Sequence, residues 1–293
     1  MSETQTLGFI GTGVMGEPMC RNLAAKSGCA VLAWDPQRAP LERLAAAGVG
    51  VAASAAELAR VADIVFVCLP GGPQLETLCE TALLPEARPS LTVVDLGTSG
   101  VGRTHALARR FAERGAEYAD APIARTREAA QKGTLAITVG AAPAVFARIR
   151  PLLQCMGTDV MHVGAVGAGQ VVKILNNMVL FQTVHALAEA LALGRRAGVS
   201  PQLLFDALAR GSADSFALRN HGMKAMLQGE YPERAFSVAY AAKDNAYALD
   251  LGRETGVRLR GAQLVADVLN EADAAGWRDA YWPVMARLVD QQG

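Results

Sequence analysis

Short apolar runs alternate with longer stretches rich in Ala, Leu, Arg and Glu over the first half of the chain. The apolar runs are bounded by Gly, Pro or polar residues and predict strands. These runs are Leu7–Ile10, Ala30–Trp34, Asp63–Leu69, Leu91–Leu96, Glu117–Ala119, Leu135–Val139 and Val160–Val163, with a shorter piece at Val49–Ala52. The stretches between them have helical length, as at Pro40–Ala47, Val101–Arg114 and Pro143–Leu153. This alternation predicts an α/β domain built on a doubly wound parallel sheet with right-handed crossovers.

The pattern changes after residue 164. A glycine-rich segment leads into one long apolar helix, Gln170 to Ala197, and no strand of comparable quality follows. Further helical segments lie at Pro201–Ala209, Asn220–Leu227, Val238–Thr255 and Ala262–Ala275. We therefore predict a first domain over residues 1–164 and an all-α domain over residues 165–293, entered through a long central helix. That helix is apolar around most of its circumference, which predicts burial between domains or between subunits of a homodimer or homotetramer.

Composition narrows the class of protein. The 293 residues are 51% hydrophobic and 19% charged, which suits a folded chain with a real core. The 28 basic and 28 acidic residues cancel, and no basic tract appears, so no nucleic-acid partner is expected. No run approaches the ~18 consecutive apolar residues of a membrane span. The polar start, Met1 to Thr6, leaves no room for a signal peptide, and we expect a cytoplasmic protein. The five cysteines and four histidines are scattered, which argues against a disulfide framework or a metal site.

A glycine motif at the end of the first strand predicts a dinucleotide site. The segment after Leu7–Ile10 reads Gly11-x-Gly13-x-x-Gly16 and opens a helix. Gly11 allows a tight turn, Gly13 leaves room for a pyrophosphate against the backbone, and Gly16 lets the helix pack close to the strand. The N–H groups and positive dipole end of the helix would then face the phosphates. The first domain is therefore predicted to be of the Rossmann type.

An acidic residue follows the motif at the distance that such a site requires. Asp35 closes the second strand, and a carboxylate about 20 residues beyond the glycines binds the ribose hydroxyls in this fold. It would also repel a 2′-phosphate, which favours NAD over NADP. The alternative is an ordinary turn in which Asp35 caps the next helix. Arg38 could also contact a phosphate.

A second candidate site lies at the start of the long helix. At 3.6 residues per turn, Lys173 and Asn177 lie on one face, with Asn176 beside them. A dehydrogenase needs a group that takes the alcohol proton as hydride leaves the carbon, and a lysine can do so if burial lowers its pKa. The two amides can hold the substrate in position. The alternative is a solvated helix end, because lysine is mostly exposed in proteins.

Two further segments carry charged residues. Arg125 and Thr126 follow a strand, at the edge of the sheet where ligands bind, and could hold a carboxylate, phosphate or sulfonate. A surface loop with an unbound arginine is the alternative there. Lys243 and Asp244 lie on a later helix, where such a pair is usually solvated and of little energetic weight.

Taken together, these motifs resemble the β-hydroxyacid dehydrogenases, which include 3-hydroxyisobutyrate dehydrogenase. The resemblance covers nearly the whole chain and rests on GFIGTGVMGEPM, DAP…GTL, GxGxxxKxxNN and FxxxxxxKD. It implies an NAD-dependent oxidoreductase acting on a small 3-hydroxy acid or aldehyde acid, with Lys173 as the acid-base residue and Asn176 and Asn177 at the substrate. The cofactor positions that it implies, beyond the three glycines and Asp35, are Val14, Met15, Leu69, Pro70, Thr98 and Lys243.

The chain departs from the family pattern at two places. Gly97 replaces a serine in the segment Asp95-Leu96-Gly97-Thr98, and Ala124-Arg125-Thr126 replaces the usual Ser-Gly-Gly. The Arg-Thr pair looks like that of sulfolactaldehyde reductases, so the expected substrate shifts toward a sulfonate or a distal carboxylate, as in succinic semialdehyde. An imine reductase of the same architecture is an alternative, although those relatives commonly lack the lysine. A non-catalytic NAD-binding regulator is another.

Overall fold

The computed structural model describes residues 5–233 and 235–291. The chain divides into two compact units, Met1–Lys173 and Ile174–Gly293. This division falls inside helix α8 (Ala168–Arg196), whereas the predicted domain boundary at residues 164 and 165 lies just before that helix. The two units are described separately below.

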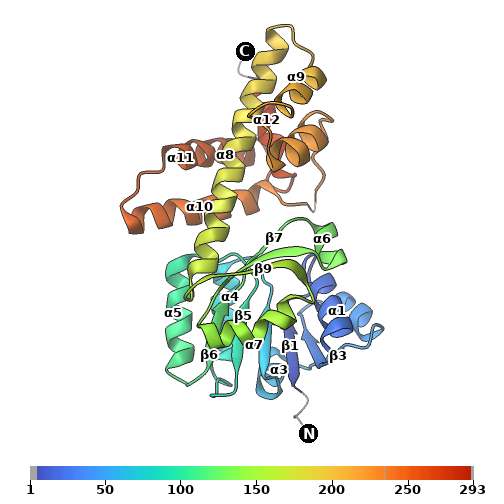
Figure 1. Ribbon diagram of the computed structural model, residues 1–293, viewed down its shortest axis with the longest axis vertical. Helices are drawn as coiled ribbons and strands as arrows, with labels where there is room; N and C mark the ends of the chain where they lie inside the picture. The colour runs from blue at the N-terminus through green and yellow to red at the C-terminus, as the bar shows by residue number, and fades with distance from the viewer. Residues whose placement is uncertain (1–4, 234, 292–293) are drawn as a thin grey trace. The chain divides into compact units, whose positions relative to one another are not determined.

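One sheet organises the first unit (Figure 1). Its strands are β1 (Thr6–Ile10), β2 (Ala30–Trp34), β3 (Gly50–Val51), β4 (Ile64–Val67), β5 (Thr92–Asp95), β6 (Glu117–Asp120), β7 (Ile123–Ala124), β8 (Leu135–Gly140) and β9 (Gly157–Gly164). They follow the order β3-β2-β1-β4-β5-β6-β8-β7, with β9 paired to β8. The chain moves outward from β1 in both directions, as a doubly wound sheet requires.

The sheet is parallel from β3 to β6, as predicted for a doubly wound sheet, and becomes mixed beyond β6. Strand β8 runs antiparallel to β6 and to β7, and parallel to β9. A parallel connection needs a crossover of a dozen or more residues, usually a helix packed on the sheet. The segment after β6 instead forms the short strand β7 and the six-residue helix α6, and the chain returns in the opposite direction.

Helices cover both faces of this sheet. They are α1 (Gly16–Ser27), α2 (Arg38–Ala45), α3 (Ala55–Val61), α4 (Gly72–Leu78) with the π-helical turn η1 (Cys79–Leu83), α5 (Val101–Ala112), α6 (Arg127–Lys132) and α7 (Pro143–Leu153). Phe9 and Phe66 point into one buried cluster with residues of α1, α2 and α7. Ile10 and Val65 point into a second cluster with residues of α3, α4 and α5. Side chains of successive strand residues alternate between the two cores, which explains the continuous apolar runs in the sequence.

The second unit is helical, as predicted. It contains most of α8, followed by α9 (Pro201–Leu208), the π-helix η2 (Leu218–Met226), α10 (Val238–Thr255), α11 (Arg260–Ala274), the 3₁₀-helix η3 (Trp282–Met285) and α12 (Ala286–Gln291). Its core gathers Phe181, Phe205 and Trp282, each buried. The edge of Trp282 meets the ring of Phe181 at a centroid distance of 4.8 Å.

By length and composition alone, α8 could cross a membrane. The same composition is found in the core helix of a folded domain, and Phe181, Val184 and Leu187 of α8 are buried in the core of the second unit. Other apolar side chains of this helix are exposed, among them Val179 and Leu193 at 59% and 71%. An exposed apolar face of this kind would suit assembly as a homodimer or homotetramer, and that assembly stays a prediction.

All five cysteines are free thiols. Burial raises the pKa of Cys20 and of Cys68 to about 12. A thiolate is the reactive form of cysteine, so these two side chains behave as small apolar residues.

Candidate active site

The glycine-rich turn joins β1 to α1, and two of its three glycines are required by packing. Gly11 has a φ of +90°, and a Cβ there would lie 2.2 Å from the Cys68 carbonyl oxygen. A Cβ on Gly16 would lie 1.8 Å from the Gly11 carbonyl oxygen, so α1 starts directly against the turn. A Cβ on Gly13 would meet no protein atom within 4 Å. Gly13 therefore leaves open space at a helix N-terminus, where backbone N–H groups favour an anion.

Asp35 is held beside this turn at the end of β2. One carboxylate oxygen accepts a hydrogen bond from the Thr12 N–H at 2.6 Å, and the other accepts from the Gln37 N–H at 2.8 Å. The carboxylate thus joins the glycine turn to the start of the next loop. After Gly13, Val14 is 51% exposed, and Met15 packs partly into the core without a side-chain capping bond to α1.

The ends of β4 and β5 lie at the same edge of the sheet. A Cβ on Gly11 would lie 3.1 Å from the Leu69 side chain, and one on Gly97 would lie 3.1 Å from the Leu69 carbonyl oxygen. The predicted residues Leu69, Pro70 and Thr98 therefore follow adjacent parallel strands, Pro70 exposed and the other two half-buried. The structure brings the cofactor positions of the first unit together along this edge.

The turn that was predicted to hold an acid group is held by protein contacts. Arg125 has a φ of +86°, in the left-handed region that disfavours side chains with a Cβ. Its guanidinium donates to the Thr134 carbonyl oxygen at 2.6 Å, to the Thr158 hydroxyl at 3.2 Å and to Asp159 at 2.5 Å. The hydroxyl of Thr126 caps α6 by accepting from the Ala129 N–H at 3.3 Å. Both side chains therefore stabilise the turn itself, and their contact with a substrate stays a prediction.

A buried polar network that sequence reasoning missed surrounds the start of α8. The Asp120 carboxylate accepts from the Gly167 N–H at 2.6 Å and from the Gln170 N–H at 2.7 Å. The Gln170 amide donates to Asp95 at 3.2 Å, and its oxygen accepts from the Ser99 N–H at 3.0 Å. Lys173 follows in the next turn of the same helix. Asp120 was visible in the DAP motif, but nothing in its local sequence indicates partners so far along the chain.

The amides of α8 belong to a second network, within the second unit. Asn176 donates to the Asn177 side-chain oxygen at 3.2 Å, and Asn177 donates to Asp244 of α10 at 2.8 Å. Asp244 is only 3% exposed and also pairs with Lys243 at 2.6 Å. The Lys243 ammonium lies 5.0 Å from the centre of the Tyr247 ring. The pair expected to be solvated is thus largely buried, and Asp244 is the residue that the sequence did not reveal.

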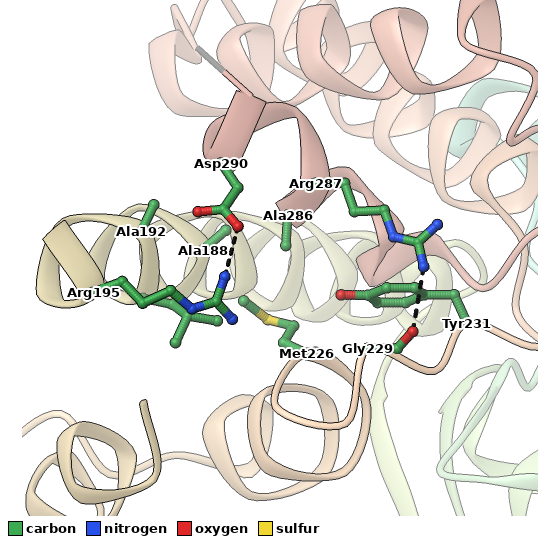
Figure 2. Close-up of a pocket in the computed structure, with 10 residues that line it drawn as sticks. Ala188, Ala192, Arg195, Met226, Gly229, Tyr231, Ala286, Arg287 and Asp290 are labelled. Atoms are coloured by element: carbon green, nitrogen blue, oxygen red, sulfur yellow. Dashed lines mark hydrogen bonds and ion pairs between the residues drawn. The ribbon is translucent and has the colours of Figure 1, made fainter. Parts of the chain in front are cut away.

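A pocket in the second unit lies apart from these residues (Figure 2). Arg195 pairs with Asp290 across it at 2.6 Å, and Arg287 stacks over Tyr231 with the guanidinium 4.9 Å from the ring centre. The predicted cofactor and substrate residues, all of which the structure describes, are not among those lining this pocket. Among the described residues, no group of three or more His, Cys, Asp or Glu is placed to hold a metal ion.

The residues of the first unit fit a nicotinamide dinucleotide. Gly13 offers backbone that a pyrophosphate can approach, and Asp35 presents a carboxylate beside it, at the carboxyl edge where such folds bind ligands. The backbone around Leu69 and Gly97 extends that edge toward the start of α8. These residues would hold the cofactor, which supplies or accepts a hydride when it is bound.

Comparison with known proteins agrees with this geometry. Residues 6–164 match the model described as the NAD binding domain of 6-phosphogluconate dehydrogenase, and residues 167–289 match that described as NAD-binding of NADP-dependent 3-hydroxyisobutyrate dehydrogenase. A 2-(hydroxymethyl)glutarate dehydrogenase of Eubacterium barkeri is 34% identical over 94% of this chain and 92% of its own. A 2-hydroxy-3-oxopropionate reductase of Escherichia coli is 33% identical over 92% of each chain.

A solved structure of 3-hydroxyisobutyrate dehydrogenase from Mycobacterium tuberculosis, with L-serine, has a TM-score of 0.89 and 30% identity to this chain. The match covers 98% of this chain and 99% of that one. Sequence and structure thus agree over both units. The chain belongs to the β-hydroxyacid dehydrogenase family, the nicotinamide-dependent oxidoreductases of small hydroxy acids that include 3-hydroxyisobutyrate dehydrogenase.

Proposed function

We propose that this enzyme oxidises a small anionic 3-hydroxy acid, or reduces the corresponding aldehyde acid, with NAD as its cofactor and Lys173 as its acid-base residue. The observation that carries the proposal is the arrangement on α8. Lys173 precedes Asn177 by one helical turn, so both lie on one face of the helix, and the buried Asp244 holds the Asn177 amide. The family explains the nicotinamide chemistry, and this face supplies the proton transfer that goes with it.

Each polar side chain of this face has a part in the proposed reaction. A bound nicotinamide would supply the hydride chemistry at the carbinol carbon. The Lys173 amine takes the hydroxyl proton during oxidation and returns it to the carbonyl oxygen during reduction, so that charge does not build up on that oxygen. Asn176 and Asn177 orient the hydroxyl side of the substrate, and their mutual hydrogen bond limits the rotamers of both.

The turn at Ala124–Thr126 supports an anionic substrate. Arg125 places a guanidinium at the carboxyl edge of the sheet, and 41% of its side chain is exposed despite the pair with Asp159. A guanidinium recognises planar carboxylates and sulfonates through paired hydrogen bonds. A sulfonate or a distal carboxylate would compete with Asp159 for this group. We therefore include a sulfonate as well as carboxylates among the substrates to be tested.

The test is turnover of purified enzyme with NAD or NADP and a panel of hydroxyisobutyrate, hydroxybutyrate and dihydroxypropanesulfonate. Lys173→Ala is expected to lower kcat by about 10²- to 10⁴-fold, the usual contribution of general acid-base catalysis, with little change in the Kd for NAD. Lys173→Arg should be nearly as slow, because a guanidinium keeps its proton. Lys224→Ala is the matched control, since Lys224 is exposed and its ammonium donates to Asn220 in its own helix.

Three results would contradict the proposal in different ways. Unchanged turnover in Lys173→Ala would remove the assigned acid-base role. Tight NAD binding without turnover of any hydroxy acid or aldehyde acid would favour a regulator instead of an enzyme, and reduction of a cyclic imine would favour an imine reductase.

A further inference from the structure

We infer that Asp120 is a positioning residue for catalysis: its carboxylate fixes the first turn of α8 and thereby sets the place of Lys173. The inference rests on the proposed function, because it assigns Asp120 a part in the proton transfer by Lys173. Asp120 itself is fully buried and is assigned a role only through its contact with α8. All the residues involved lie in the first unit, so the argument depends on that unit alone.

The contact is a charged cap at a helix N-terminus. The two oxygens of Asp120 accept from the N–H groups of Gly167 and Gln170, at 2.6 and 2.7 Å. These are short, charge-assisted bonds to N–H groups that have no partner within a helix. Asp120 is the last residue of β6 and is fully buried, so its side chain contacts protein groups and not solvent. The cap therefore ties the start of the helix to the end of β6.

Glycines are needed on both sides to let this carboxylate in. A Cβ on Gly169 would lie 2.8 Å from one Asp120 oxygen and 2.6 Å from the Thr138 carbonyl oxygen. A Cβ on Gly140 would lie 2.5 Å from the other Asp120 oxygen. The glycines before Lys173 thus serve the close approach of α8 to β6 and β8, where any side chain would push the helix outward.

Gln170 links the cap to the neighbouring strand. Its amide donates to Asp95, at the end of β5, and to the Gly97 carbonyl oxygen at 2.9 Å. Asp95 and Asp120 are register partners on adjacent parallel strands, and Gln170 contacts both. One residue therefore fastens the helix to two strand ends. Lys173 lies three residues further along, so a displacement of the first turn moves its side chain by a similar distance.

The charge of Asp120 is better explained by positioning than by stability. Burial raises the pKa of this carboxyl, and the N–H groups of Gly167 and Gln170 only partly oppose that rise. Ionising the group inside the protein therefore costs free energy. A neutral amide of the same shape avoids that cost, but its NH2 group faces one of the two N–H groups, so it loses the second acceptor that holds the helix.

The test compares Asp120→Asn with wild type. We expect kcat to fall by about 10²-fold, as a misplacement near 1 Å can cause, while the Kd for NAD changes less than about twofold. Hydrogen exchange should become faster in the first two turns of α8 and stay unchanged in β1 and β4. Ser54→Ala is the control, because it removes the side-chain cap of α3, whose oxygen accepts from the Glu57 N–H at 3.0 Å, and should leave kcat unchanged.

Full kcat in folded Asp120→Asn, with Lys173→Ala inactive, would overturn this inference and leave the proposed function intact. Retained turnover in Lys173→Ala would instead contradict the proposed function. Should Asp120→Asn not fold, Gly169→Ala provides the same comparison, because its Cβ would lie 2.8 Å from one Asp120 oxygen and push the first turn of α8 away from that carboxylate. A kcat loss with unchanged NAD affinity supports the inference there, and a wild-type kcat overturns it.

Discussion

At the scale of single residues, we expect Asp35 to favour NAD over NADP. Its carboxylate is fixed by the N–H groups of Thr12 and Gln37, so it cannot turn away from a phosphate on the adenosine ribose. Asp35→Ser removes this repulsion, and we expect the ratio of kcat/KM with NADP to that with NAD to rise at least about tenfold, equivalent to about 1.4 kcal/mol.

The control for this variant lies at the opposite edge of the sheet. Asp63 accepts from the Thr6 N–H at 2.8 Å, so Asp63→Ser also removes a carboxylate that bonds to the backbone near β1. Its cofactor ratio should equal that of wild type. An unchanged ratio in Asp35→Ser, measured by initial rates with both cofactors, would show that cofactor choice is made elsewhere.

Single residues also show how far the sequence can predict the site. Asp35 was predictable because its distance from the glycines is a fixed property of the fold. Asp120 and Asp244 were not, because their partners Gly167 and Asn177 lie 47 and 67 residues away along the chain. A buried carboxylate shows its role only when the groups that satisfy it are in place. The positive φ of Arg125 could not be predicted either, because arginine as a residue type does not indicate such a backbone conformation.

At the scale of elements, the turn between β1 and α1 contains one glycine that serves cofactor binding and another that serves folding. A Cβ on Gly13 meets no atom, so Gly13→Ala should unfold at the wild-type temperature while its Kd for NAD rises at least about tenfold through contact with the pyrophosphate. Gly16→Ala introduces a Cβ 1.8 Å from the Gly11 carbonyl oxygen and should lower the melting temperature strongly. Thermal melts and NAD titration of both variants check the contrast. Equal losses of stability in the two would contradict it.

The elements themselves were largely predictable. Helices α7 and α10 have the predicted bounds, because Pro and Ser mark their starts and their apolar residues repeat with helical spacing. Strands β8 and β9 were predicted as strands, but their direction relative to β6 was not. Periodicity identifies a strand and its faces, whereas direction depends on how the connecting segment folds. The π-helical form of η2 could not be predicted either, because the hydrophobic pattern distinguishes helix from strand but not one kind of helix from another.

At the scale of the whole molecule, the half-buried His221 makes stability depend on pH. His221 lies 2.5 Å from the Tyr281 hydroxyl, and burial lowers its pKa from 6.5 to about 4. As the pH falls, His221 therefore binds a proton near pH 6.5 in the unfolded chain but only near pH 4 in the folded chain. Stability is retained above this window and is lost progressively as the pH falls through it, by on the order of 3 kcal/mol.

Melting temperatures between pH 7 and 4 provide the measurement. His221→Gln keeps a polar side chain that cannot be protonated, so its melting temperature should fall less steeply with pH than that of wild type. Acidic groups titrate in both proteins, and the difference between the curves isolates His221. Parallel curves would mean that folding does not lower the pKa of His221.

Helix α8 also bears on how this chain can be recombined with its relatives. The division between the two compact units falls between Lys173 and Ile174, inside an unbroken helix. A chimera joined there would take Lys173 from one parent and Asn177 from the other, although the two residues share one helical face. A join among the glycines before Ala168 would instead transfer Lys173 and both asparagines together from one parent. The start of α8 from that parent would then have to contact Asp120 from the other parent. Exchange of substrate range between relatives should therefore succeed only where the parents agree around that carboxylate.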